Sequence, residues 1–288
     1  MTDTLSLLQA PSALVLVVGA LGLVVGSFLN VVIHRLPRMM EAEWAAECAG
    51  LTGNAVPEDA RLSLATPASR CPACSTPIRV IHNIPVLSWL ALRGRCAACN
   101  APISLRYPMV ELGAAGLGAF LAWRLGWGWA LPAALVLAWS LLAASVIDFD
   151  TQLLPDRITL PLLWAGLLAN VGGVFAPLEA AVVGAVAGYL ALWLVYWAFK
   201  LATGKEGMGY GDFKLLAALG AWLGWQLLPV VVLVAACAGS VLGLASMVIS
   251  GSGRDLRIPF GPFLAVGGLV ALLWGHRLTA WWLGAPFL

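Results

Sequence analysis

Charged residues are scarce in this chain. Of its 288 residues only 10% are Asp, Glu, Lys or Arg, whereas 61% are hydrophobic and the mean hydropathy is +0.92. A soluble domain of this length could not bury so much apolar surface, so the composition excludes that class and predicts a polytopic helical membrane protein. The net charge is only +2, and we expect no nucleic-acid partner.

Several common catalytic and nucleotide-binding motifs are also missing. The glycine-rich sequence GMGYG at 207–211 lacks the Gly-Lys-Ser/Thr ending of a phosphate-binding loop, and Asp212 directly after it would repel phosphate. The chain has no GxGxxG dinucleotide-binding sequence, no serine-nucleophile elbow and no paired Cys–His nucleophile. The sequence therefore gives no support for a nucleotide-dependent enzyme or for a serine or cysteine hydrolase.

The long apolar runs predict about eight transmembrane helices, because a span needs about 20 predominantly apolar residues. The expected spans are 11–33, 108–126, 128–147, 157–175, 178–199, 212–228, 229–250 and 259–283. The first run lacks a basic leader and continues through GSFLNVVIHRLP, so we interpret it as a span and not as a cleaved signal peptide.

The basic residues predict the orientation. Fourteen of the 16 Lys and Arg residues lie in the segments 35–107, 148–157, 200–214 and 251–258, which all fall on one side of the predicted spans. The positive-inside rule makes that side cytoplasmic, and an even number of spans then places both termini in the periplasm. The acidic residues near 148–156 and 206–212 would accordingly lie at the cytoplasmic membrane boundary.

One polar insertion interrupts the membrane pattern and holds five of the six Cys residues. We expect three parts: a first transmembrane helix (1–36), a cytoplasmic minidomain (37–107) and a seven-helix membrane domain (108–288). CPAC (Cys71, Cys74) and CAAC (Cys96, Cys99) have the spacing of a four-cysteine zinc site. Disulfides or a redox CxxC pair are the alternatives, but thiols stay reduced in the cytoplasm. The fold class predicted is therefore an all-α polytopic membrane protein with a small cytoplasmic zinc-binding insertion between helices one and two.

Five acidic residues lie in two segments that interrupt the apolar runs, SVIDFDTQLLPD (145–156) and KEGMGYGDFK (205–214). They are Asp148, Asp150, Asp156, Glu206 and Asp212. Carboxylates at membrane depth are costly and mark functional sites by default. Asp148 ends the third predicted span and Asp212 opens the sixth, so the bundle could bring them together.

Two adjacent carboxyl groups tend to share one proton, which is the logic of an aspartic peptidase. One group would act as a base toward water and the other as an acid toward a substrate carbonyl. Asp156 and Asp212 also fit N-cap or first-turn positions, and Asp150 could be a solvated loop charge. From these residues alone, capping and catalysis both stay open.

Two function classes compete with hydrolysis. Intramembrane acids also mark ion pathways, so an ion-coupled transporter is an alternative, although the chain shows no clear internal repeat. The other alternative is a zinc-bearing membrane assembly factor that performs no catalysis. Asn at Asp148 and Asp212 would then have no effect, whereas loss of the paired Cys residues would abolish function.

The motifs resemble those of the bacterial type IV prepilin peptidases, which are GxGD aspartic peptidases. The resemblance covers most of the chain and includes GSFLNVVIHRLPRMM (26–40), NIPVLSWLALRGRCAAC (83–99), ISLRYPMVE (103–111), IDFDTQLLPD (147–156) and GMGYGDFK (207–214). It implies that Asp148, the first Asp of the D-x7-D segment, and Asp212 of GxGD are the catalytic pair.

The resemblance also implies a substrate, a cofactor and a location. Substrates would be type IV prepilins or type II secretion pseudopilins, cleaved after a Gly at the cytoplasmic face of the bacterial inner membrane. Many members also methylate the new N-terminal residue with S-adenosylmethionine. Short relatives without the Cys-bearing domain do not methylate, which links 37–107 to methyl transfer. A peptidase without methyltransferase activity is the alternative within the same family, and the sequence identifies no residues for the methyl donor.

Overall fold

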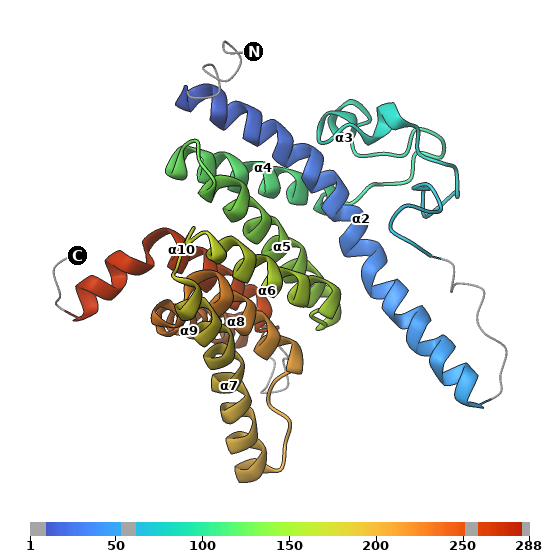
Figure 1. Ribbon diagram of the computed structural model, residues 1–288. Coiled ribbons are helices and arrows are strands. Elements are labelled where there is room, and N and C mark those ends of the chain that lie inside the picture. The colour runs from blue at the N-terminus through green and yellow to red at the C-terminus, as the bar shows by residue number, and fades with distance from the viewer. Residues whose placement is uncertain (1–9, 53–61, 251–258, 284–288) are drawn as a thin grey trace. The chain divides into compact units, whose positions relative to one another are not determined.

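The computed structural model describes residues 10–52, 62–250 and 259–283, and most of these residues are helical, whereas 62–105 is largely turns and loops (Figure 1). Each predicted span contains a helix. The long helices are α2 (Pro11–Thr52), α4 (Arg106–Leu125), α5 (Ala130–Thr151), α6 (Asp156–Val171), α7 (Leu178–Thr203), α8 (Tyr210–Leu223), α9 (Leu228–Ser250) and α10 (Gly261–Leu283). The chain divides into two compact units, Met1–Trp139 and Ser140–Leu288.

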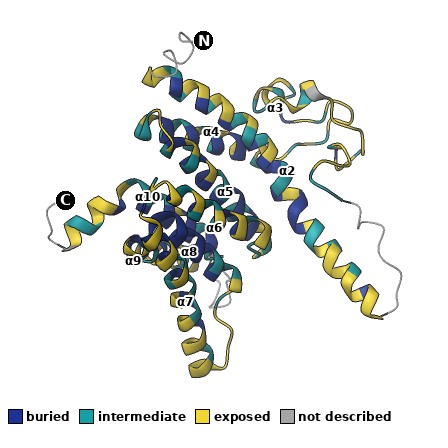
Figure 2. Ribbon diagram, in the orientation of Figure 1, coloured by how far each residue is buried: buried dark blue, intermediate teal, exposed yellow. Residues whose placement is uncertain are grey.

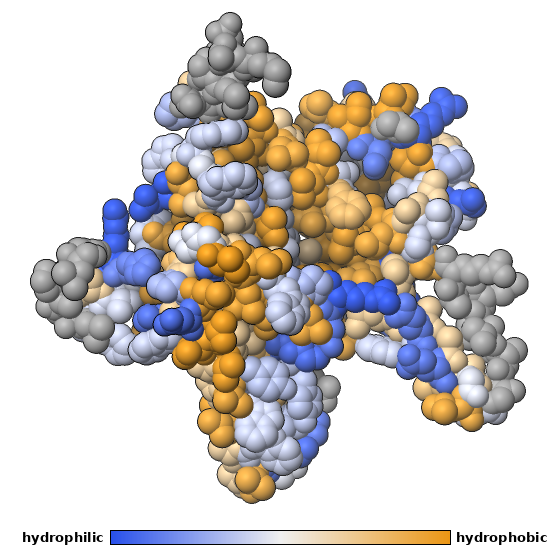
Figure 3. Space-filling model, viewed as in Figure 1, coloured by the Kyte–Doolittle hydropathy of each residue, from blue (hydrophilic) through white to orange (hydrophobic). Residues whose placement is uncertain are grey.

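Five helical segments in the described ranges are long and apolar enough to cross a membrane. They are Pro11–Thr52, Ala130–Thr151, Leu178–Thr203, Trp225–Ile249 and Gly261–Trp282. Apolar side chains cover much of the surface in Figure 3, as expected where helices face lipid. Among the remaining long helices, α6 has 16 residues and α8 has 14, which corresponds to about 21–24 Å. The prediction of a helical membrane protein is confirmed, with five candidate spans by length and composition in the described residues.

Some helix ends differ from the predicted spans. Helix α2 does not stop near residue 33 but continues through Pro37 to Thr52. Residues 38–52 are rich in Ala, Glu and Met, which favour helix, and one proline costs the helix a single backbone hydrogen bond. Helix α8 ends at Leu223 and not at 228, because Gly224 adopts a positive φ of 78° and caps the Gly220 carbonyl.

The first unit is built on α2 and α4, which pack closely through small residues. A Cβ atom at Gly22 would lie 2.6 Å from Ala115 Cα, and one at Gly26 would lie 2.6 Å from Glu111 Cα. The polar segment 62–105 contains η2 (Val80–Asn83) and the short helix α3 (Leu87–Ala91).

Two charged side chains bind the backbone of this polar segment. The buried Arg35 guanidinium of α2 donates hydrogen bonds to the Ser63 and Pro67 carbonyls at 2.9 and 2.6 Å. The Glu111 carboxylate of α4 accepts the Val86 N–H at 2.7 Å. Charge-assisted hydrogen bonds of this kind are roughly twice as strong as neutral ones. They attach the polar segment to the two helices at separate points.

Helix α8 is the buried element of the second unit (Figure 2). It packs against α6, α7 and α10. The contact with α7 depends on glycine, because a Cβ at Gly188 would lie 2.6 Å from the Leu216 carbonyl oxygen and one at Gly220 would overlap the Gly184 carbonyl. Backbones this close leave no space for a side chain between them.

Buried hydrogen bonds fix the far end of α8 against α6. The Asn170 amide nitrogen donates to the carbonyls of Ala221 and Trp222 at 2.8 and 2.9 Å. The Trp222 indole N–H donates in return to the Leu162 carbonyl at 2.8 Å. The two bonds from Asn170 satisfy carbonyl groups that the end of α8 leaves without an intrahelical partner. These contacts restrict the movement of α8, and Asp212 lies in the first turn of this helix.

Candidate active site and metal centre

Asp148 and Asp212 are buried and lie close together in the second unit. Asp148 belongs to the last turn of α5 and Asp212 to the first turn of α8. Their exposed fractions are 5% and 7%, and the charge of Asp148 acts on Asp212. The structure thus brings together the two aspartates that the sequence analysis paired.

A third segment completes this pair. The Gly261 N–H, at the start of α10, donates a hydrogen bond to Asp148 Oδ2 at 2.9 Å. Leu154 lies between Gly261 and Gly211, since a Cβ at either glycine would come within 3.1 Å of the Leu154 side chain. The start of α10 therefore binds Asp148 directly. Leu154, which follows α5, packs against Gly261 and against Gly211, the residue before Asp212.

The other three acids of the two segments lie outside this pair. Asp150 is exposed at the end of α5. Asp156 opens α6 and accepts hydrogen bonds from Lys214 Nζ, at 2.7 Å to each carboxylate oxygen. Glu206 forms an ion pair with Lys200 at 2.9 Å. Asp156 lies in the first turn of α6, one of the positions that the sequence allowed for it, and its bond with Lys214 links the starts of α6 and α8.

The four cysteines of the CPAC and CAAC motifs lie close together in the first unit. The Sγ atoms of Cys71, Cys74, Cys96 and Cys99 all lie within 4.8 Å of one another, and Cys71 and Cys99 are 3.9 Å apart. Tetrahedral zinc with Zn–S bonds of about 2.3 Å places its sulfur ligands about 3.8 Å apart. The four thiols could therefore hold a metal ion, and their geometry fits zinc.

The two CxxC turns have the same backbone conformation. The Cys71 N–H donates to the Thr76 carbonyl at 3.0 Å, and the Cys96 N–H donates to the Ala101 carbonyl at 2.9 Å. A residue with φ of 57° follows the second Cys of each turn, Ser75 in the first and Asn100 in the second. The repeated turn points both thiols of each pair toward the centre of the cluster.

The surroundings of the thiols favour their deprotonated, metal-binding form at two positions. Hydrogen bonds with Thr76 lower the pKa of the Cys74 thiol to about 6. Backbone N–H groups of Cys99 and Ala98 lower the pKa of Cys96. The Ala101 N–H also lowers the pKa of Cys99, but the neighbouring thiols and burial raise it to about 11. Four crowded thiols resist complete ionisation, and a bound divalent cation would supply the compensating charge.

Two protein-family models match the chain, one in each half. Residues 20–125 match the model for the bacterial peptidase A24 N-terminal domain, and residues 135–244 match the model for the type IV leader peptidase family. The chain belongs to the type IV leader peptidase family. The N-terminal match contains the cysteine cluster, and the other match contains Asp148 and Asp212.

Relatives of this leader peptidase family member align along nearly its full length. A protein of Stutzerimonas stutzeri named prepilin leader peptidase/N-methyltransferase is 55% identical and covers 97% of both chains. Proteins with the same name from Aeromonas salmonicida and Pseudomonas aeruginosa are 54% and 53% identical, over 91% and 93% of both chains. No solved structure is significantly similar to the chain.

Sequence reasoning missed two residues of the site, Gly261 and Leu154. The motif FGPF marks the start of the last predicted span, but nothing in it shows that the Gly261 N–H would meet a carboxylate 113 positions earlier. Leu154 lies inside the quoted IDFDTQLLPD segment, where an ordinary apolar residue gives no signal of a role. Both contacts depend on how α5, α8 and α10 pack.

A methyl group at Gly261 should disturb the candidate active site and slow cleavage. In Gly261→Ala the new Cβ would lie 2.6 Å from Asp148 Oδ2, so the carboxylate or the start of α10 must shift. Misplacement of a catalytic group by about 1 Å can cost roughly 100-fold in rate. We expect cleavage of a prepilin N-terminal peptide to fall by about that factor. Gly116→Ala, at a site with no atom within 4 Å, is the control, and equal rates in the two variants would contradict the geometry.

Removing one thiol should empty the metal site. In Cys71→Ser and Cys96→Ser a tetrahedral ion would lose one thiolate ligand, and structural zinc sites need all four ligands. Elemental analysis of the purified protein should give about one zinc per chain for wild type and close to none for either variant. Cys48→Ser, outside the cluster, should keep its metal. One zinc per chain in all four proteins would show that these thiols do not bind it.

Proposed function

We propose that the protein is a membrane aspartic endopeptidase that cleaves the leader of type IV prepilins and type II secretion pseudopilins after a Gly. The observation that carries this proposal is the buried pair Asp148 and Asp212, which lies inside the match to the type IV leader peptidase family. The names of the relatives, which describe prepilin leader peptidases, supply the substrate class.

The chemistry follows from two carboxyl groups that share a proton. The ionised group takes a proton from water, whose oxygen attacks the scissile carbonyl carbon. The protonated group donates its proton to the carbonyl oxygen, and the resulting tetrahedral intermediate collapses with proton transfer to the departing amine. Because Asp148 Oδ2 accepts the Gly261 N–H, a bond that favours an unprotonated oxygen, we place the shared proton on Asp148 Oδ1 or on Asp212.

The glycines around the pair suit a peptide substrate. Gly209, three residues before Asp212, has no side chain, and a Cβ atom there would meet only Asp212 Oδ2, at 3.9 Å. An extended peptide needs close backbone approach to place its carbonyl between two carboxyl groups.

We further propose that the protein methylates the new N-terminal residue with S-adenosylmethionine as donor. The names of the relatives include N-methyltransferase, and the match to the bacterial N-terminal domain covers the cysteine cluster. In this proposal one zinc ion on the four cysteines has a structural role and stabilises the minidomain, because the four thiolates fill its coordination sphere. Zinc takes no part in either reaction, and we assign no residue to the donor.

The location proposed is the bacterial inner membrane, with the active site at the cytoplasmic face and both termini in the periplasm. The distribution of basic residues supports this orientation. Eight spans would require α4, α6 and α8 to cross with the five helical segments that are long and apolar enough by themselves. Burial against neighbouring helices allows α8 to be shorter and to carry a carboxylate.

Product masses test both activities in one experiment. Detergent-purified wild type should cleave a synthetic prepilin N-terminus after Gly and, with S-adenosylmethionine, add one methyl group to the product. Asp148→Asn and Asp212→Asn should each lose cleavage by roughly a thousand-fold or more, because the pair acts as a unit. Asp150→Asn, an exposed neighbour at the same helix end, should cleave normally.

Each other result has a defined meaning. Cleavage without a methyl gain leaves a peptidase that has lost its second activity. Normal cleavage by either Asp148→Asn or Asp212→Asn would refute the assignment of the pair. A folded wild type that does not cleave would favour an ion-coupled transporter or an assembly factor.

A further inference from the structure

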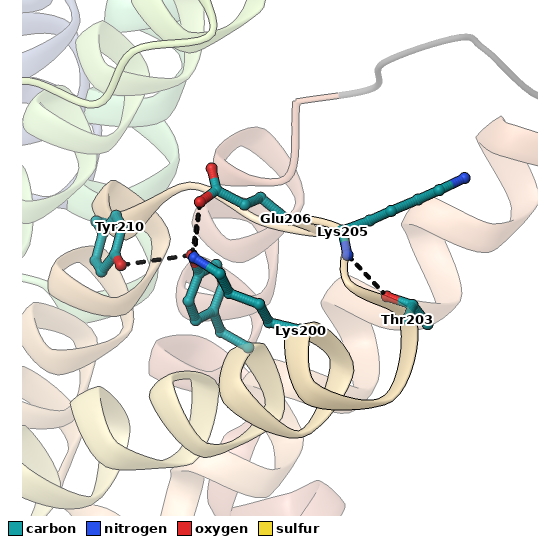
Figure 4. Close-up of polar contacts among 6 residues, drawn as sticks. Lys200, Thr203, Lys205, Glu206 and Tyr210 are labelled. Atoms are coloured by element: carbon teal, nitrogen blue, oxygen red, sulfur yellow. Dashed lines mark hydrogen bonds and ion pairs between the residues drawn. The ribbon is translucent and has the colours of Figure 1, made fainter.

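A polar cluster lies beside the segment that leads into Asp212. Lys200 Nζ, near the end of α7, is 2.9 Å from Glu206 Oε1 and donates a hydrogen bond to the Tyr196 hydroxyl at 3.1 Å (Figure 4). The Tyr196 hydroxyl also donates to Glu206 Oε1 at 3.3 Å, and the Tyr210 hydroxyl donates to Tyr196 at 3.5 Å. The four side chains therefore form one connected network between α7 and the start of α8.

Tyr196 contacts both ends of this segment. Its hydroxyl reaches Glu206 at the beginning, and its ring packs on Tyr210 and Phe213 at the end, with ring centroids 5.3 and 5.7 Å apart. Tyr196 is 2% exposed and Phe213 is completely buried. Since Phe213 directly follows Asp212, the Tyr196 ring supports the turn that carries the carboxyl group.

The segment between these two contacts is rich in glycine and needs external support. Gly207, Gly209 and Gly211 alternate with Met208 and Tyr210. Glycine loses more backbone freedom on ordering than any other residue, so a glycine-rich segment is held only if its ends are fixed. Gly207 also packs on the Phe199 ring, which a Cβ atom would approach to 2.7 Å.

The ion pair can order the segment without adding much to global stability. The Lys200 and Glu206 side chains are 33% and 69% exposed, and exposed pairs contribute little to unfolding free energy. Hydrogen bonding with Lys200, together with its charge, holds the pKa of Glu206 below its usual range, so Glu206 is a carboxylate at neutral pH. The network is thus present under the conditions in which the peptidase would work.

We propose that Tyr196, Lys200 and Glu206 are positioning residues that hold the segment 206–212 and thereby aim the Asp212 carboxyl group at the scissile carbonyl. This inference rests on the proposed peptidase function. None of the three residues takes part in the chemistry, because they act on Asp212 through the glycine-rich segment. Their loss should lower turnover and leave substrate binding unchanged.

The variants Lys200→Met, Glu206→Gln and Tyr196→Phe remove the charges or the hydroxyl and keep the size of each side chain. The control is Lys205→Met, because the Lys205 side chain points away from the network (Figure 4). We expect kcat for a prepilin N-terminal peptide to fall about 10-fold or more in the three variants, with KM within about 2-fold of wild type. The control should match wild type in both constants.

A rescue experiment separates positioning from general damage. The double variant Lys200→Glu/Glu206→Lys restores an ion pair with reversed charges, and it should recover a large part of the kcat that either single reversal loses. Failure of the double variant to exceed the single reversals would overturn the role of the pair. A rise in KM with unchanged kcat would also overturn it, since the residues would then bind substrate directly.

Amide hydrogen exchange tests the same inference without any substrate. Peptides that cover 204–213 should exchange faster in Glu206→Gln than in Lys205→Met, while α9 peptides should be unchanged. If wild type and the control do not cleave at all, the proposed function fails and the role in aiming Asp212 fails with it, while exchange still shows whether the network orders the segment. Equal exchange and equal kcat in all variants would show that the network does not position the segment.

Discussion

The close burial of α8 among α6, α7 and α10 is the constraint on which the candidate active site depends. Glycines on α7 and α8 remove the side chains that would separate the two backbones, and a Cβ atom at Gly220 would overlap the Gly184 carbonyl. Asn170 and Trp222 then fix the far end of α8 to α6 through buried hydrogen bonds. Because the helix has no room to shift, the carboxyl group in its first turn has a defined place.

The polar segment 62–105 is held in place by other interactions than α8 is. A segment of this size cannot bury enough apolar surface to fold stably by itself, and four convergent thiols offer a metal staple instead. Arg35 of α2 and Glu111 of α4 bind backbone groups of the same segment, so its attachment depends on charge-assisted hydrogen bonds and not on a large apolar interface. The position of the aspartates is thus fixed mainly by burial between helices. The position of the cysteine segment is fixed mainly by hydrogen bonds and by the convergence of the four thiols.

The sequence predicts those features that depend on local pattern. Apolar runs locate the helices, paired CxxC spacing predicts a cluster that could bind a metal, and acids in apolar surroundings mark the pair Asp148 and Asp212, whose catalytic role stays a prediction. Features that depend on packing are not predicted: the Gly261 N–H on Asp148 joins residues 113 positions apart. The sequence does not predict the extension of α2 through Pro37, because the change from apolar to polar residues marks the end of an apolar run and not the end of a helix. The sequence marks Glu206 as an acid between apolar runs, but it does not show the ion pair with Lys200, which lies on α7.

The most direct test of the account is whether positions 148 and 212 meet in the folded protein. In a chain with Cys48→Ser and Cys237→Ser, the pair Asp148→Cys/Asp212→Cys should be joined by a short bifunctional methanethiosulfonate reagent, and mass spectrometry of the digested protein should identify the linked peptides. The control is the pair Glu179→Cys/Asp212→Cys. Glu179 lies in the first turn of α7, at the other end of that helix from Lys200, so this pair should not be joined. Efficient linkage of the first pair alone is the result that the account predicts. No linkage between 148 and 212 in well-folded protein, or equal linkage in the control, would contradict a shared site for the two aspartates.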